Sequence, residues 1–218
     1  MLFPTAPVPQ KAGSLTCTKA ELDNSSGSLR MNAVNASMNG IISNGSGSLT
    51  AGNITVGTTA AAASDYQCII SNASGHMETG DVTVSGSLNL STASGPAALG
   101  QVSAAAYTVS TASGSLKLTG LNGNGSLSCA SGSIKAGTLI PTGPVSMDNG
   151  SGSIRASIPE NTGLEFYAAH IGPGSINAFF PIPDKKSASA QSPVQYGNAP
   201  YFQITASTQT GSITLNKK

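Results

Sequence analysis

The sequence predicts an all-β protein built as a single-stranded, right-handed parallel β-solenoid (β-helix), and two observations carry this prediction. First, a Ser-Gly-Ser-Leu/Ile tetrad begins at Ser113, Ser131 and Ser151, so it returns after 18 and then 20 residues. A regular return near this interval is typical of stacked repeats in which each repeat forms one turn. Second, apolar and polar residues alternate after the tetrad, as in Ile154-Arg155-Ala156, which is the pattern of a half-buried strand. The right-handed sense is expected because parallel β crossovers are overwhelmingly right-handed.

The composition excludes several other classes of protein. Only 9% of the 218 residues are charged, whereas an ordinary soluble domain has about 25%. A disordered chain would also lack aliphatic residues, but here they make up much of a 39% hydrophobic content and recur at ordered intervals. The net charge of +1 argues against nucleic acid as a partner, since phosphate binding needs concentrated Lys and Arg. No apolar run is long enough to span a membrane.

Residues 1–12 are predicted to form a linker or an N-terminal cap, because Pro4, Pro7 and Pro9 favour an extended segment without ladder hydrogen bonds. The first residues do not have the basic region and long apolar stretch of a signal peptide. Residues 13–218 are predicted to form one β-solenoid domain.

Full or looser copies of the tetrad recur along this domain, and each is predicted to form a corner. A helical solenoid is disfavoured because Gly, Ser, Asn and Thr are poor helix formers and occur in every repeat. The glycine of each tetrad is expected where the backbone needs a positive φ, which a Cβ atom would oppose. These glycines are Gly13, Gly27, Gly47, Gly75, Gly95, Gly114, Gly132, Gly152, Gly174 and Gly211.

Two segments interrupt the regular spacing of the tetrads and are predicted to be irregular insertions, near residues 57–66 and 179–202. The second segment is rich in proline and holds half of the chain's ten aromatic residues, namely Phe179, Phe180, Tyr196, Tyr201 and Phe202. Because the end of a solenoid exposes apolar core and an open strand edge, this segment is predicted to be an irregular C-terminal cap.

The three cysteines are predicted to be small buried side chains rather than metal ligands. Cys17 follows Leu15 by two residues and Cys129 follows Leu127 by two, a spacing that points both members of a pair inward. The number of cysteines is odd, and none has the spacing of a metal site, although one disulfide remains open. No metal and no cofactor are expected.

No catalytic site is predicted, because titratable groups are not clustered. The chain has only two histidines, His76 and His170, and its nine acids are scattered. A polysaccharide-active enzyme remains a remote alternative, since pectin-cleaving β-helices use clusters of acidic or basic residues that are absent here.

The candidate binding residues are basic side chains that follow the inward aliphatic residue of a repeat: Lys117, Lys135 and Arg155 in three successive turns, and Arg30 earlier in the chain. Stacking would place the three in one ladder. One interpretation is a solvated stripe that protects the sheet from aggregation. The other is a row that matches a repeating anion, such as an anionic envelope glycan.

The repeated Ser-Gly-Ser-Ile sequence, with IPENTGLEFYAAHIGPGSINAFFP at residues 158–181, resembles bacterial adhesin-type domains of unknown function that are related to LiaG-like envelope proteins. A last strand after Thr210-Gly211 ends the domain in the same way, so the resemblance covers roughly residues 13–216. Family members usually carry Asp where this chain has Ser in the tetrad, so cation-dependent behaviour is not carried over. The resemblance implies a β-solenoid at the cell surface or outside the cell, anchored to the membrane in the full-length protein, with no catalytic residues.

The leading functional hypothesis is therefore a non-enzymatic, adhesin-like binding or scaffold module of the cell envelope. Its expected partner is an envelope glycan or a surface protein, and the chain itself is expected to be a monomer or a weak homo-oligomer. The alternative is a structural protein that associates end to end.

Overall fold

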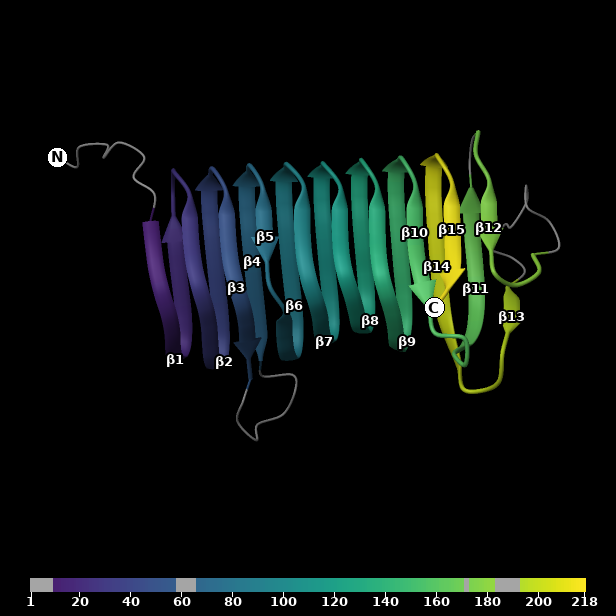
Figure 1. The fold of residues 1–218 in the computed structure, drawn as a ribbon, viewed down its shortest axis with the longest axis horizontal. Coiled ribbons are helices and arrows are strands. Elements are labelled where there is room, and N and C mark those ends of the chain that lie inside the picture. Colours follow the sequence, from purple (N-terminus) through teal and green to yellow (C-terminus); the bar gives the residue numbers. More distant parts are fainter. Residues whose placement is uncertain (1–9, 58–65, 171–172, 183–192) are drawn as a thin grey trace.

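The computed structural model describes residues 10–57, 66–170, 173–182 and 193–218, and these residues are all-β with no helix among them. Figure 1 shows the strands stacked side by side along one long axis. The first ten strands are β1 (Gln10–Asn24), β2 (Leu29–Ser46), β3 (Leu49–Val56), β4 (Gln67–Ser74), β5 (Met77–Thr79), β6 (Val82–Ser94), β7 (Ala97–Ser113), β8 (Leu116–Ser131), β9 (Ile134–Ser151) and β10 (Ile154–Ile158). The last five are β11 (Gly163–His170), β12 (Ile176–Ala178), β13 (Val194–Tyr196), β14 (Tyr201–Thr210) and β15 (Ile213–Lys217).

The strands repeat a parallel arrangement, in which each turn of the chain pairs in register with the next. In β8 and β9, for example, Leu116 lies opposite Ile134 and Leu127 lies opposite Met147. Strands β2, β3, β5, β7, β6 and β4 pair in a closed ring of six, because the long strands β2, β6 and β7 each contribute to two sides of the stack. The predicted all-β class with repeated parallel strands is confirmed.

The last residue of each tetrad from Gly27 onward is a core residue, as the alternation predicts. One column of inward side chains runs through the stack at this position and is buried: Leu29, Leu49, Met77, Ala97, Leu116, Ile134, Ile154, Ile213 and Ile176. Burial of each large aliphatic side chain contributes about 1.5–3 kcal/mol. The column therefore fixes the register of every turn on the next.

The tetrad glycines from Gly27 onward occupy the corners that the sequence predicts, with positive φ values. Gly13 is the exception, because it lies within strand β1 without a positive φ, and a Cβ atom there would have nothing within 4 Å; the prediction of a corner at Gly13 is wrong. Gly132 has a φ of +129°, and a Cβ atom there would lie 2.1 Å from the carbonyl oxygen of Gly114 in the preceding turn. The Gly132 N–H donates to the carbonyl oxygen of Ser151 in the following turn at 2.9 Å. Successive corners thus stack backbone on backbone, at a separation that leaves no room for a side chain.

The order of the last turns differs from the order of the chain. Strand β15 pairs with β10, and β12 pairs with the other edge of β15. In the chain, however, β12 follows β10 and precedes β15. Ile176 and Ile213 both follow a corner glycine, so the repeat pattern alone does not distinguish the two orders. Because β12 lies outside β15, the aromatic residues that follow β12 lie at the end of the stack.

An aromatic cluster lies at this C-terminal end of the stack. Phe180 packs edge-on against Phe166 and Phe179, with ring centroids 5.8 and 5.1 Å apart, and it stacks on Tyr196 at 5.2 Å. Strand β13 pairs antiparallel with β11 beside the cluster. Tyr201 remains exposed, so only part of the predicted aromatic group contributes. Residues 183–192 of the predicted insertion lie outside the described residues, as do residues 58–65 of the earlier insertion and residues 1–9 of the predicted linker.

The three cysteines are free thiols, with Cys68 and Cys129 buried and Cys17 half-buried. Burial raises the pKa of Cys68 to about 12, from an ordinary value of 9.0. Burial also raises the pKa of Cys129, partly opposed by a hydrogen bond with the backbone of Ser131. Neither thiol ionises near neutral pH in the folded protein.

Stability is therefore expected to fall in alkali. A raised folded-state pKa gives stability that is fully present below the unfolded-state pKa, near 9, and is lost as pH rises toward 12. Each pH unit in this window should cost about 1.4 kcal/mol for Cys68. Urea denaturation at pH 8 and pH 10 checks this, and Cys68→Ala should show a smaller pH dependence than the wild type. An equal dependence in both would contradict the assignment.

Candidate functional site

Three exposed cations lie side by side on adjacent strands and form what we call the basic ladder: Lys117, Lys135 and Arg155. Lys135 is in register with Lys117 on one side and with Arg155 on the other. Neighbouring strands are about 4.8 Å apart, which also sets the spacing at which the three side chains leave the sheet. Each cation lies between two buried residues of its own strand, so the pleat of the sheet points it outward.

None of the three cations of the basic ladder forms an ion pair with a described residue. The ion pairs among the described residues join Lys19 to Glu21, His76 to Glu78 and Lys217 to Glu160. Like charges at this spacing repel one another modestly in water. An external anion that contacts all three cations would relieve this repulsion.

A row of serines runs beside the basic ladder and adds hydrogen-bonding groups. The hydroxyl oxygen of Ser115 accepts the backbone N–H of Ser133 at 3.2 Å, and that of Ser153 accepts the backbone N–H of Ser212 at 3.4 Å. A hydroxyl that accepts one hydrogen bond still has a proton to donate. The basic ladder and the serine row beside it therefore present cations and hydroxyl donors with the same spacing along the stack.

Arg30, the fourth predicted residue, is not brought together with the other three. It lies on the same row, but Thr50, Glu78 and Ala98 separate it from Lys117. Its basic neighbour is Lys11, one turn earlier. The sequence pattern missed Lys11 and Ala98, because neither follows a complete tetrad.

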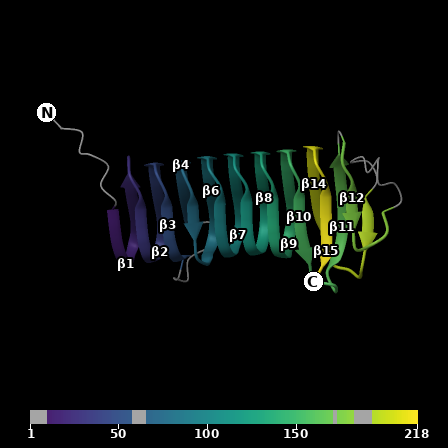
Figure 2. The same cartoon turned by 45° about the horizontal axis from the view of Figure 1, so that its top comes forward.

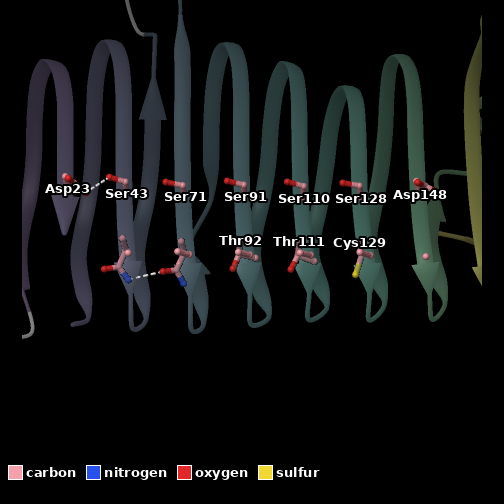
Figure 3. A pocket seen from close by; sticks show the side chains of 18 of the residues that line it. Asp23, Ser43, Ser71, Ser91, Thr92, Ser110, Thr111, Ser128, Cys129 and Asp148 are labelled. Atoms are coloured by element: carbon pink, nitrogen blue, oxygen red, sulfur yellow. Dashed lines mark hydrogen bonds between the residues drawn. The ribbon is translucent and has the colours of Figure 1, made fainter. Parts of the chain in front are cut away.

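A second surface feature was not predicted from the sequence. An open trough of about 940 Å³ follows the stack, and a row of serine hydroxyls runs along it between two aspartates, as Figure 3 shows. Ser43 donates to the Asp23 carboxylate at 2.7 Å, and Ser207 donates to the Asp148 carboxylate. The row consists of Asp23, Ser43, Ser71, Ser91, Ser110, Ser128 and Asp148.

A buried polar row lies next to these serines and holds the corners together. The Asn44 amide group donates to the Asn72 side chain at 2.9 Å and to the Gly47 carbonyl at 3.0 Å. Asn24 donates to Asn44 at 2.8 Å in the same way. Thr92 and Thr111 occupy the equivalent positions in later turns and bind the corner backbone through their hydroxyls. The signal in the sequence is an Asn, Thr or Cys three residues before each corner glycine from Gly27 to Gly152 and before Gly211, and its role is structural.

The described residues contain no group of three or more His, Cys, Asp and Glu side chains that could hold a metal ion. His76 Nε2 lies 3.9 Å from the Glu78 carboxylate, and both side chains are exposed. Among the residues with described positions, no helix has the length and apolar character needed to cross a membrane.

Comparison with known proteins gives one match. The family described as Toastrack DUF4097 matches residues 8–216, which is nearly the whole chain. No curated protein and no solved structure matches the chain.

Proposed function

Since the chain belongs to the Toastrack DUF4097 family, a domain family of unknown function, we propose a function from the geometry of its surface. The protein is a non-enzymatic, adhesin-like binding module at the bacterial cell surface, and its basic ladder binds a repeating anion such as an anionic envelope glycan. The observation that carries this proposal is the in-register placement of Lys117, Lys135 and Arg155 on three adjacent strands.

The stack itself supplies the reason why a polymer is the expected ligand. We infer that the turns form one single-stranded, right-handed β-solenoid, which is supported by the parallel pairing and by the strong preference of parallel crossovers for the right-handed sense. Such a scaffold repeats its surface groups at about 4.8 Å along a straight row. A linear anion can therefore contact successive cations, whereas a single small anion contacts one or two.

The proposal is tested by reversing the charge of the ladder. The double substitution Lys117→Glu and Lys135→Glu should lower the affinity for anionic envelope glycans by tenfold or more, measured on an immobilised glycan panel, because charge complementarity is lost at two adjacent positions. Arg30→Glu is the matched control, because Arg30 is exposed on the same row but separated from the ladder. Unchanged binding of the double variant to every anionic glycan would refute the proposal.

The single substitution Lys135→Glu separates binding from folding. Lys135→Glu replaces two repulsive contacts, with Lys117 and Arg155, by two attractive ones. The variant should therefore be at least as stable to urea as the wild type while it loses binding. A ladder that only maintained solubility would instead show aggregation without a change in glycan binding.

A further inference from the structure

The two ends of the stack differ in how their core and their outer strand edge are covered. At the C-terminal end, aromatic rings cover the core around Phe180. At the other end β1 pairs with β2, and no described strand pairs with its second edge (Figure 2). The main-chain N–H and C=O groups along that edge are therefore available to another strand.

The apolar side chains of β1 are also incompletely covered. Four inward residues of β1 are half-buried, although their in-register partners in β2 are 0–3% exposed. The four pairs are Ala12 on Met31, Leu15 on Val34, Cys17 on Ala36 and Leu22 on Ile42. The apolar core thus reaches the N-terminal end of the described stack, where these four residues are only partly covered, although Ala20 of the same strand is 1% exposed.

Two charges of opposite sign in β1 lie at mirrored positions about its middle residue, Cys17. Lys11 lies six residues before Cys17 and Asp23 lies six residues after it, and both are exposed. Lys19 and Glu21 neutralise each other at 3.4 Å. Edge strands usually carry charges that repel another strand, but charges of opposite sign at mirrored positions make an edge complementary to itself.

We propose that this edge is the interface between two copies of the chain. A two-fold axis through Cys17 pairs β1 with β1 of the second copy in the antiparallel direction, because such an axis reverses the strand. Lys11 then faces Asp23 of the second copy, Asp23 faces its Lys11, and Ala12 packs against its Leu22. The capped C-terminal ends point outward, so the assembly closes at two copies and does not continue as a fibre.

This interface is independent of the anion-binding proposal, because it involves none of the three residues of the basic ladder. It replaces the expectation of open end-to-end association with a closed dimer. The added main-chain hydrogen bonds extend the sheet by one strand on each copy, which is a recurring mode of protein recognition.

Sedimentation velocity of the full chain under reducing conditions, over a wide concentration range, tests the dimer. The expected result is a monomer–dimer equilibrium without larger species. Lys11→Glu should raise the dissociation constant by about tenfold or more, because it creates two repulsive contacts per dimer. The double variant Lys11→Glu with Asp23→Lys should restore it, and Lys218→Glu is the control for the change in net charge.

A short bismaleimide linker provides a second test of the axis. It should join the two Cys17 thiols of a dimer, whereas Cys68 and Cys129 are buried and Cys17→Ser should give no covalent dimer. A monomer at all concentrations would overturn the proposal. If the β1 backbone amides of that monomer were protected from hydrogen exchange, the edge would be paired with the residues before Gln10 instead. Species larger than a dimer, or a charge swap that fails to restore association, would also overturn it.

Discussion

Replacing Gly132 by alanine will lower the free energy of unfolding by about 3 kcal/mol or more, because two costs add. The residue has a φ of +129°, which an L side chain rarely adopts. The added Cβ atom would also lie 2.1 Å from the Gly114 oxygen and 2.6 Å from its carbonyl carbon, so two stacked turns would have to separate. The strain is not relieved by rotating a side chain, since both contacts are with backbone.

Urea denaturation of Gly132→Ala beside Ser131→Ala measures this effect. Ser131 is the exposed neighbour in the same corner, and its substitution should change the stability by less than about 0.5 kcal/mol. A loss below about 1 kcal/mol for Gly132→Ala would mean that the turns are not stacked as closely as described.

Substitution of Phe180 by alanine is expected to have a comparable effect at the end of the stack. Phe180 is 4% exposed and contacts three other rings, and truncation of a buried phenylalanine costs about 3–5 kcal/mol. Phe180→Leu keeps most of the buried area and should lose less than half as much. Both variants are compared with the wild type by urea denaturation.

The Phe180→Ala variant should also change how the protein associates. Removing the ring uncovers core at the end that does not pair in the proposed dimer, so larger species should appear in sedimentation at high concentration. Unchanged stability together with unchanged association would show that the aromatic cluster is not a cap.

The repeat pattern predicts the regular part of this fold well, because its signals are local. Leu116, Ile134 and Ile154 follow corner glycines and alternate with polar residues, and the structure stacks them in one buried column. The ladder of Lys117, Lys135 and Arg155 follows directly from this register. Once the register between two neighbouring turns is set at one position, it is set for the residues that follow in the same strand.

The parts that the sequence does not predict depend on contacts between distant segments. Ile176 and Ile213 have the same local pattern, so only packing decides that β15 lies between β10 and β12. The trough was missed for a different reason. Ser71, Ser91 and Ser110 are common residues in a serine-rich chain, and only the register shows that they form one row.

If three cations in register recognise a repeating anion, a polymer should bind more tightly than its repeating unit, and this comparison tests the proposed function. The measurement is isothermal titration of the wild type and of Lys135→Glu with poly(glycerol phosphate) and with glycerol phosphate. We expect the polymer to bind the wild type at least tenfold more tightly than the variant, and glycerol phosphate to bind both weakly. Equal affinity of the polymer for the two proteins would contradict the account.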